Sequence, residues 1–231
     1  MKIIKTLLVD NQSFSLINDD IRLELSSPGR ATFVVVSDKD LSGIVMMNAG
    51  WSESQTYRYF IGYIERSVAI NPKQKKLFCR ELSATLNRPM DLGLRHVTAK
   101  DVLIELSRLT NINFNYPDSP YMDEVAPYFY HLGSGYQAMD TIGRVYEINQ
   151  YIWQMQTDGS LYVGSWQESR WADKPVQIPD DLFTDHMSTN SAKLPMSPAL
   201  RPGVKFNRGI IHSVQLSSET MVISWKPSSD W

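Results

Sequence analysis

The segment Gly133–Ala138 comes closest in this sequence to a motif with known chemistry. It reads G-x-G-x-x-A, follows a possible strand at Tyr128–Leu132 and opens a predicted helix, which is the context of a dinucleotide-binding fingerprint. In such a site the helix leads to a second parallel strand, whose end carries an acidic residue that binds the ribose. Here the acidic residue at the matching distance is Asp158, in the turn of a predicted antiparallel hairpin. We therefore interpret Gly133–Ala138 as a glycine-rich helix start.

Other residue types that commonly carry catalysis or bind metals are scattered along the chain. The Gly-Ser-Gly run is one residue short of the G-x-S-x-G nucleophile elbow of serine hydrolases. The histidines lack the H-x-x-x-H or H-E-x-x-H spacing of a zinc site; they are His96, His131, His186 and His212. Asp123 and Glu124 are adjacent in a proline-flanked loop, whereas a glycosidase needs two carboxylates that converge across a cleft.

Cys79 is the single cysteine, which excludes an internal disulfide and a multi-cysteine zinc module. It lies in a predicted strand between Phe78 and Arg80, and we interpret it as an inert, buried thiol. From these patterns we predict that the protein is not an enzyme. We also predict that it has no catalytic, cofactor-binding or metal-binding residues, and that it needs no cofactor.

Charge and hydropathy narrow the classes of partner. The 231 residues include 23 basic and 25 acidic side chains, a net charge of −2, which argues against a dedicated, sequence-specific nucleic-acid-binding protein. No stretch approaches the roughly 20 apolar residues of a membrane-spanning helix, so we expect no stable membrane insertion. The segment Met1–Asp10 lacks the features of a signal peptide, and we expect the protein to assemble in the cytoplasm.

The segment from Lys2 to about Leu94 predicts antiparallel strands. Short runs rich in β-branched and aromatic residues alternate with turn residues at regular spacing, which is typical of a barrel or sandwich. The expected strands are Ile21–Leu25, Ala31–Val36, Ile44–Met47, Tyr57–Arg66 and Lys76–Leu82, with turns at Ser26–Gly29, Asp38–Gly43 and Asn71–Gln74. Gly62 is a candidate bulge or barrel corner. We predict an N-terminal β-barrel over residues 1–95.

In residues 96–170 the spacing of the apolar residues changes to include helical periods, which predicts an α/β middle domain. Apolar residues at helical spacing follow Thr98, which forms a capping-box pattern with Asp101, and Asn111 ends this helix. Further elements are expected at Ile112–Tyr116 (strand), Tyr136–Glu147 (helix) and Tyr151–Gln156 with Leu161–Val163 (hairpin). Asp158 and Gly159 between the hairpin strands favour a type I′ turn.

Residues 171–231 predict a loop-rich segment followed by a closing hairpin. Five prolines punctuate the first part, and we expect the polar segment Asp180–Asn190 to be mobile. The strands Ile210–Leu216 and Thr220–Trp225 form a hairpin too small to stand alone. We expect it to pair with strands of the middle region and complete a second β-barrel. The predicted fold class is therefore mainly β (α+β), with two small antiparallel barrels joined by an α/β middle domain.

Aromatic residues are abundant and are not interleaved with basic residues, so core packing and protein interfaces are their expected roles. The main groups are Tyr57, Tyr59, Phe60, Tyr63, Tyr128, Phe129, Tyr130, Tyr151, Trp153, Tyr162, Trp166 and Trp171.

Short stretches along nearly the whole chain follow the order seen in one known family. They are Ser27–Phe33, Arg58–Glu65, Thr98–Leu103, Tyr151–Trp153, Gly159–Trp166, Leu200–Val204, Ile211–Val214 and Thr220–Ile223. Arg58–Glu65 is similar to the family's F-x-G-x-V strand, and Leu200–Val204 to its final P-G segment. Together they resemble the tail hub proteins of bacteriophages, the late-control-D-like family, whose relatives include baseplate hubs and the hub part of type VI secretion spikes.

The resemblance implies two similar barrels joined through an α/β insertion, and a homotrimer whose ring of six barrels matches a sixfold tail tube to a threefold spike or fibre. It implies a virion protein of the tail tip or baseplate that forms part of the DNA ejection conduit. The implied partners are further copies of the chain, the tail tube or distal tail protein, the central spike or fibre protein and the tape measure protein.

Two other functions remain open from the sequence. Thr98–Leu103 with Thr110–Phe114 also resembles the N-domains of secretin channels, which would make the protein a secretion-channel component. A carbohydrate-binding or hydrolytic tail accessory protein is the second alternative, and it requires an acidic cleft with exposed aromatic residues.

Overall fold

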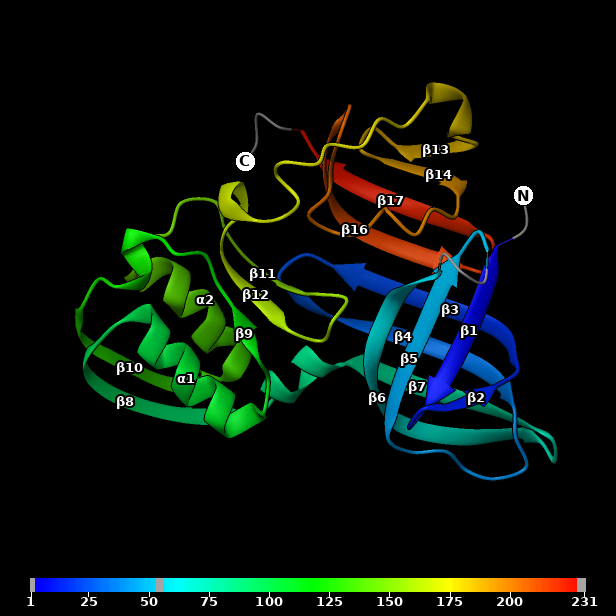
Figure 1. Cartoon of the computed structure of the whole chain (residues 1–231), viewed down its shortest axis with the longest axis horizontal. Coiled ribbons are helices and arrows are strands. Elements are labelled where there is room, and N and C mark those ends of the chain that lie inside the picture. Colours follow the sequence, from blue (N-terminus) through cyan, green and yellow to red (C-terminus); the bar gives the residue numbers. More distant parts are fainter. Residues whose placement is uncertain (1–2, 53–55, 228–231) are drawn as a thin grey trace.

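The computed structural model describes residues 3–52 and 56–227. Most of the strands belong to one twelve-stranded sheet with the hydrogen-bonded order β13-β14-β17-β16-β3-β4-β7-β6-β5-β1-β2, and β15 pairs with β16 (Figure 1). Its strands are β1 (Ile4–Val9), β2 (Gln12–Phe14), β3 (Leu16–Glu24), β4 (Ser27–Val36), β5 (Ile44–Gly50), β6 (Thr56–Asn71), β7 (Gln74–Glu81), β13 (Asp185–Ser188), β14 (Ser191–Pro195), β15 (Lys205–Phe206), β16 (Gly209–Ser217) and β17 (Thr220–Lys226).

The predicted N-terminal strands are confirmed as elements of this sheet, with some shifts of their ends. Buried and exposed residues alternate along β4, so that Ala31, Phe33 and Val35 enter the core. The turn expected at Ser26–Gly29 is shorter, because β4 already begins at Ser27. Gly62 pairs with Val45 and with Glu81, and a Cβ atom there would lie 1.9 Å from the carbonyl oxygen of Arg80. Close backbone approach therefore requires glycine at this position.

The strand path of the large sheet is open in the part of the chain that the structure describes. The ends of the path are β13 and β2, and no backbone pairing joins them. The prediction of a mainly β protein with antiparallel sheets is confirmed, whereas the description as two closed barrels is not confirmed.

The C-terminal hairpin β16–β17 extends the N-terminal sheet. Val214 lies opposite Leu23 and Leu216 opposite Ile21, in antiparallel register. The expectation that this hairpin pairs with strands of the middle region is therefore wrong. The free edge of β3 accepts it because the apolar faces of both strands continue into the same core, which buries all four side chains.

The polar segment 180–190 is partly regular. It contains the 3₁₀ turn η5 (Asp180–Leu182) and β13, which pairs with β14 at the edge of the sheet. Every residue of β13 is exposed, so its polar composition reflects an edge strand held by backbone hydrogen bonds. The segment therefore contains regular elements. Its expected mobility stays a prediction.

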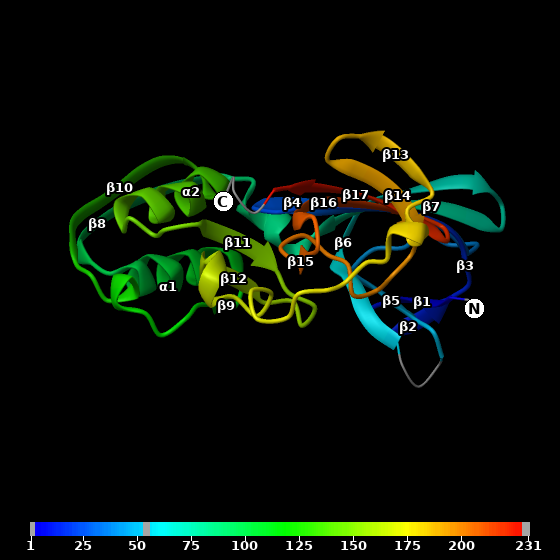
Figure 2. The same ribbon diagram turned by 90° about the horizontal axis from the view of Figure 1, so that it is seen from above.

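The middle region contains two small sheets and both α-helices (Figures 1 and 2). Its elements are β8 (Pro89–Val97), α1 (Ala99–Thr110), β9 (Phe114–Asn115), β10 (Ala126–Ser134), α2 (Gly135–Val145), β11 (Tyr151–Met155) and β12 (Leu161–Ser165); further short 3₁₀ turns are η2 (Leu82–Leu86), η3 (Pro120–Met122) and η4 (Trp166–Glu168). The helices contact the two-stranded β8–β10 sheet and the β11–β12–β9 sheet. Their apolar faces form a second core, separate from that of the large sheet.

Local signals at the helix ends are confirmed. Thr98 and Asp101 form the predicted capping box of α1, and Asn111 ends the helix in the left-handed conformation with φ 57°. Ser134 caps α2 through a second capping box with Gln137. These contacts satisfy backbone N–H groups that have no partner within the helix.

The β11–β12 hairpin is confirmed, but its turn is not type I′. A type I′ turn needs positive φ at both central residues, and only Gly159 has it, at 91°. The loop is longer than two residues, because the N–H of Gln156 donates to the carbonyl of Ser160 at 2.8 Å. The carboxylate of Asp158 accepts from the Ser160 N–H at 2.9 Å and holds the turn in this form.

Candidate functional site

The segment Gly133–Ala138 is the junction between β10 and α2. Its strand lies in an antiparallel pair with β8, and the helix leads into the antiparallel β11–β12 hairpin. The parallel βαβ arrangement of a dinucleotide site is thus absent from these described elements. A Cβ atom on Gly135 would lie 2.8 Å from the Leu86 carbonyl oxygen, so close packing accounts for glycine there. His131 contacts the Ser134 carbonyl through Nε2 at 2.9 Å.

Two of the remaining candidate residues form ionic contacts. Asp123 forms an exposed ion pair with Lys100 at 2.7 Å, and His212 lies 3.4 Å from Glu24. Among the described residues, no group of three or more His, Cys, Asp or Glu side chains could hold a metal ion. Burial raises the pKa of the Cys79 thiol to about 12, which keeps it protonated and unreactive at neutral pH.

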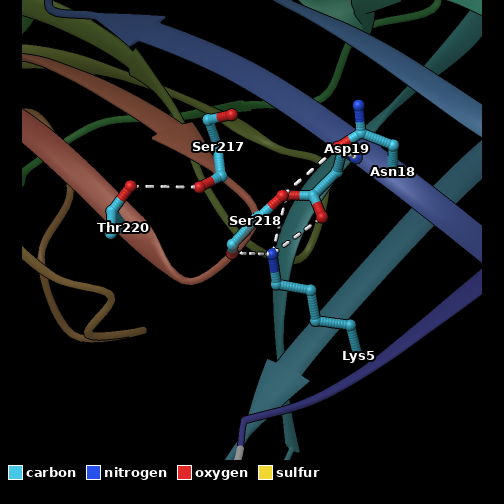
Figure 3. Close-up of polar contacts among 6 residues, drawn as sticks. All are labelled: Lys5, Asn18, Asp19, Ser217, Ser218 and Thr220. Carbon is cyan, nitrogen blue, oxygen red and sulfur yellow. Dashed lines mark hydrogen bonds and ion pairs between the residues drawn. The ribbon is translucent and has the colours of Figure 1, made fainter.

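A network of ionic contacts ties the first strand to the C-terminal hairpin (Figure 3). Lys5 on β1 donates to both carboxylate oxygens of Asp19 on β3, at 2.8 and 2.7 Å, and to the carbonyl of Ser218 between β16 and β17. β1 and β3 are not hydrogen-bonded neighbours in the sheet. The Lys5 side chain therefore bridges two strands that are not joined by backbone pairing. Burial raises the pKa of Asp19, and Lys5 opposes that rise.

A second buried ionic group joins the loop before β15 to the large sheet. Arg201 Nη2 lies 3.7 Å from Glu81 Oε1, and its Nη1 donates to the carbonyl of Tyr59. The other Glu81 oxygen accepts from the Gly29 N–H at 2.6 Å. Glu81 is 1% exposed, and burial raises its pKa to about 7 although Arg201 and the Gly29 hydrogen bond lower it.

The exposed face of the β8–β10 pair carries three large apolar side chains. Tyr128, Tyr130 and Leu132 alternate along β10 and are 65%, 70% and 64% exposed. Their neighbours Phe129 and His131 face inward. Opposite them on β8 lie Arg95, Gly93 and Asp91. We call Tyr128, Tyr130 and Leu132 the aromatic face.

The aromatic face has the residue composition of a protein-binding surface. Aromatic residues are enriched in protein interfaces, since one ring buries much area at low entropic cost. The Arg95 guanidinium lies over the Tyr128 ring, 5.7 Å from its centroid, and adds a charged rim. The sequence predicted core packing or interfaces for the aromatic groups. Burial in the core is confirmed for Tyr59, Phe60, Trp153, Tyr162, Trp166 and Trp171.

Among the described residues, no helix is long and apolar enough to cross a membrane. No family model matches the chain.

One curated relative comes from a bacteriophage. The chain is similar to an uncharacterised 58.7 kDa protein in the lys 3′ region of Haemophilus phage HP1, with 37% identity over 224 residues. The match covers 97% of this chain and 42% of that protein. The chain thus spans about two-fifths of the length of the curated relative it matches.

Three solved structures share the fold over almost the entire chain. The 43 kDa tail protein of prophage MuSo2 from Shewanella oneidensis has a TM-score of 0.72 at 9% identity, covering 98% of this chain and 99% of that one. A tail protein from Neisseria meningitidis MC58 has a TM-score of 0.68 at 10% identity, covering 100% and 98%. The Escherichia coli c3393 protein, a type VI secretion component similar to bacteriophage T4 tail proteins, has a TM-score of 0.58 at 11% identity, covering 96% and 76%. The chain therefore has the fold of phage tail proteins.

Proposed function

We propose that this protein is a structural component of a phage tail and acts as the hub of the tail tip or baseplate. The observation that carries the proposal is the match of nearly the whole chain to two tail proteins, at TM-scores of 0.72 and 0.68. The relative in phage HP1 independently links the sequence to a phage. The solved structures share only about a tenth of their residues with this chain. They therefore show the fold, whereas the role in the tail is our proposal.

In the proposed assembly, three copies form a ring between a sixfold tail tube and a threefold spike or fibre. The similarity to a type VI secretion component related to T4 tail proteins supports a position next to a spike. A ring of three identical chains needs heterologous contacts, in which two different surfaces of each copy meet. The aromatic face on β10 is the surface that we assign to a protein contact in the tail, because its three large side chains are exposed.

The same ring would form part of the conduit for DNA. The net charge of −2 suits a passage that does not retain a polyanion, because strongly basic walls bind DNA by releasing its counterions. We expect no measurable binding of duplex DNA at physiological salt. Filter binding over a salt series tests this, and sub-micromolar affinity with a steep salt dependence would make the protein a nucleic-acid binder.

The assembly is tested by mass and by position. A trimer of the 231-residue chain has a mass of about 79 kDa, three times 26.4 kDa. Analytical ultracentrifugation, alone and with purified tail tube and spike proteins, should show this species or a monomer that trimerises on a partner. Electron microscopy of labelled virions should place it at the tail tip. A dimer both in solution and in the particle, or a label along the tube, would refute the hub.

A further inference from the structure

A surface cavity lies between Trp51, the start of β6, the turn of the β11–β12 hairpin and two C-terminal loops. Its volume is about 650 Å³, far larger than a single ion needs. Its lining residues are Trp51, Tyr57, Arg58, Thr157, Arg170, Trp171, Lys174, Val176, Ser197, Pro198, Ala199, Arg201 and Val204. Sequence patterns gave no signal for this cavity, because its walls come from four segments far apart in the chain.

The described lining is basic and contains no carboxylate. Four of its residues are cations: Arg58, Lys174, Arg170 and Arg201. Arg58 has a buried Nε atom without a hydrogen-bond partner among the described residues. Such a donor loses its hydration without compensation, which is costly unless a ligand supplies the acceptor.

The positive charges are only partly balanced by the protein. Arg201 has Glu81 at 3.7 Å, on the inner side and away from the cavity lining. In the described part of the chain, Arg170 and Lys174 have no carboxylate within ion-pair distance. Burial lowers the pKa of Arg170, and repulsion by Arg201 lowers it further, against the attraction of Asp158. Repulsion between these two like charges destabilises the unliganded protein.

We propose that this cavity binds an acidic segment of a partner protein, with a carboxylate among the arginines and an apolar side chain against the aromatic walls. Arginine suits the role, since its planar fork binds a carboxylate through two parallel hydrogen bonds. Two aromatic residues of the lining differ in exposure: Tyr57 is 63% exposed, whereas Trp171 is 5% exposed. A pocket with apolar walls and a few convergent charges fits one or two anchored side chains better than a continuous polynucleotide backbone.

The site can be tested on the isolated protein, separately from any role in a tail. The probe is the capped peptide acetyl-Asp-Glu-Trp-amide, and its control is acetyl-Asn-Gln-Trp-amide, both measured by isothermal titration calorimetry. We expect one saturable site for the acidic peptide and at least tenfold weaker binding of the amide control. Inorganic phosphate should compete with the acidic peptide, because it binds the same cations.

Variants locate the binding in the cavity. Arg170→Gln should weaken the binding of the acidic peptide at least tenfold. Lys174→Gln should have the same effect, and it changes an exposed residue and leaves the core intact. Arg144→Gln, an exposed substitution on α2, should bind like the unchanged protein. Arg170→Gln should also keep or raise the melting temperature, because it removes repulsion from Arg201.

Three results would overturn the proposal. They are no binding of the acidic peptide, equal binding by all variants, or a lower melting temperature of Arg170→Gln with peptide affinity unchanged in Lys174→Gln. A single-stranded oligonucleotide is the alternative ligand. If it binds more tightly than the peptide, and if the same variants lose this binding, the cavity is assigned to nucleic acid.

Discussion

The buried carboxyl of Glu81 predicts a specific dependence of stability on pH. Burial outweighs the attraction of Arg201 and raises the Glu81 pKa from 4.5 to about 7, so the folded protein prefers the protonated form. The stabilising contribution is complete below about pH 4.5 and is lost as the pH rises through about 7, because the folded state must then hold a buried charge.

The size of the effect follows from the two pKa values. At about 1.4 kcal/mol per pKa unit, a rise from 4.5 to about 7 corresponds to about 3 kcal/mol. Glu81→Gln keeps a polar group of the same shape that is neutral at every pH. We expect the free energy of unfolding of Glu81→Gln, relative to the unchanged protein, to increase by about 3 kcal/mol from about pH 4.5 to about pH 8.5. The raised pKa of Asp19 is common to both proteins and cancels.

The assay is urea unfolding followed by tryptophan fluorescence at a series of pH values. Glu65→Gln removes the same formal charge from an exposed ion pair with Arg80 and serves as the control. A difference between Glu81→Gln and the unchanged protein that stays constant across the range would refute the reasoning. It would mean that Glu81 is charged throughout and that Arg201 compensates its burial completely.

Three further substitutions test the core, the ionic bridge and the aromatic face. Phe60→Asp should prevent folding, seen by circular dichroism, because Phe60 is 1% exposed and packs edge-on against Phe33. Lys5→Met should lower the free energy of unfolding in urea by about 3–5 kcal/mol, since it leaves the buried Asp19 without its cation. A decrease below about 1 kcal/mol would show that solvent takes the place of the Lys5 ammonium group. Tyr130→Ser should leave the melting temperature unchanged but reduce incorporation into virions at least tenfold, measured by immunoblot of purified particles; normal incorporation would remove the aromatic face from the tail contacts.

Elements whose determinants are adjacent in the sequence could be predicted. The capping box of Thr98 and Asp101, the left-handed Asn111 and the Ser134 cap each depend on residues within one helical turn. The alternation of buried and exposed residues along a strand, as at Ala31, Phe33 and Val35, is also a pattern within a single element. These local signals placed both helices and most of the strands.

Pairings between distant segments could not be predicted in the same way. The hairpin β16–β17 has an alternating pattern that fits many sheet edges, and nothing near Val214 specifies Leu23 as its partner. The choice depends on which edge continues a common core, a property of the folded chain. The turn at Asp158 fails for another reason, since its side chain caps Ser160 and stabilises a longer loop.

The candidate surfaces show the same difference between local patterns, which the sequence reveals, and contacts that only the fold creates. Alternation along β10 separates Tyr128 and Tyr130 from Phe129, but aromatic residues occupy both faces, so the pattern does not reveal which face meets solvent. The arginines of the cavity come from positions 58, 170 and 201, and only the fold brings them together. Sequence reasoning therefore reached the class of the protein before any of its binding surfaces.

The β11–β12 hairpin explains how the two cores can act as one frame for these surfaces. Ile152 and Tyr162 enter the core of the large sheet, whereas Trp153 and Val163 enter the core of the helices. Every residue of β12 is buried, and Ser26 beside β4 donates its N–H to the carbonyl of Trp153 at 3.1 Å. A strand buried on both faces cannot shift without disrupting both cores. The strand β10 carries the aromatic face on its solvent side and packs its other side on the helices that contact this hairpin. The cavity opens on the large sheet. Packing through the hairpin therefore fixes the relative positions of the two surfaces, which a ring built from repeated contacts between identical chains requires.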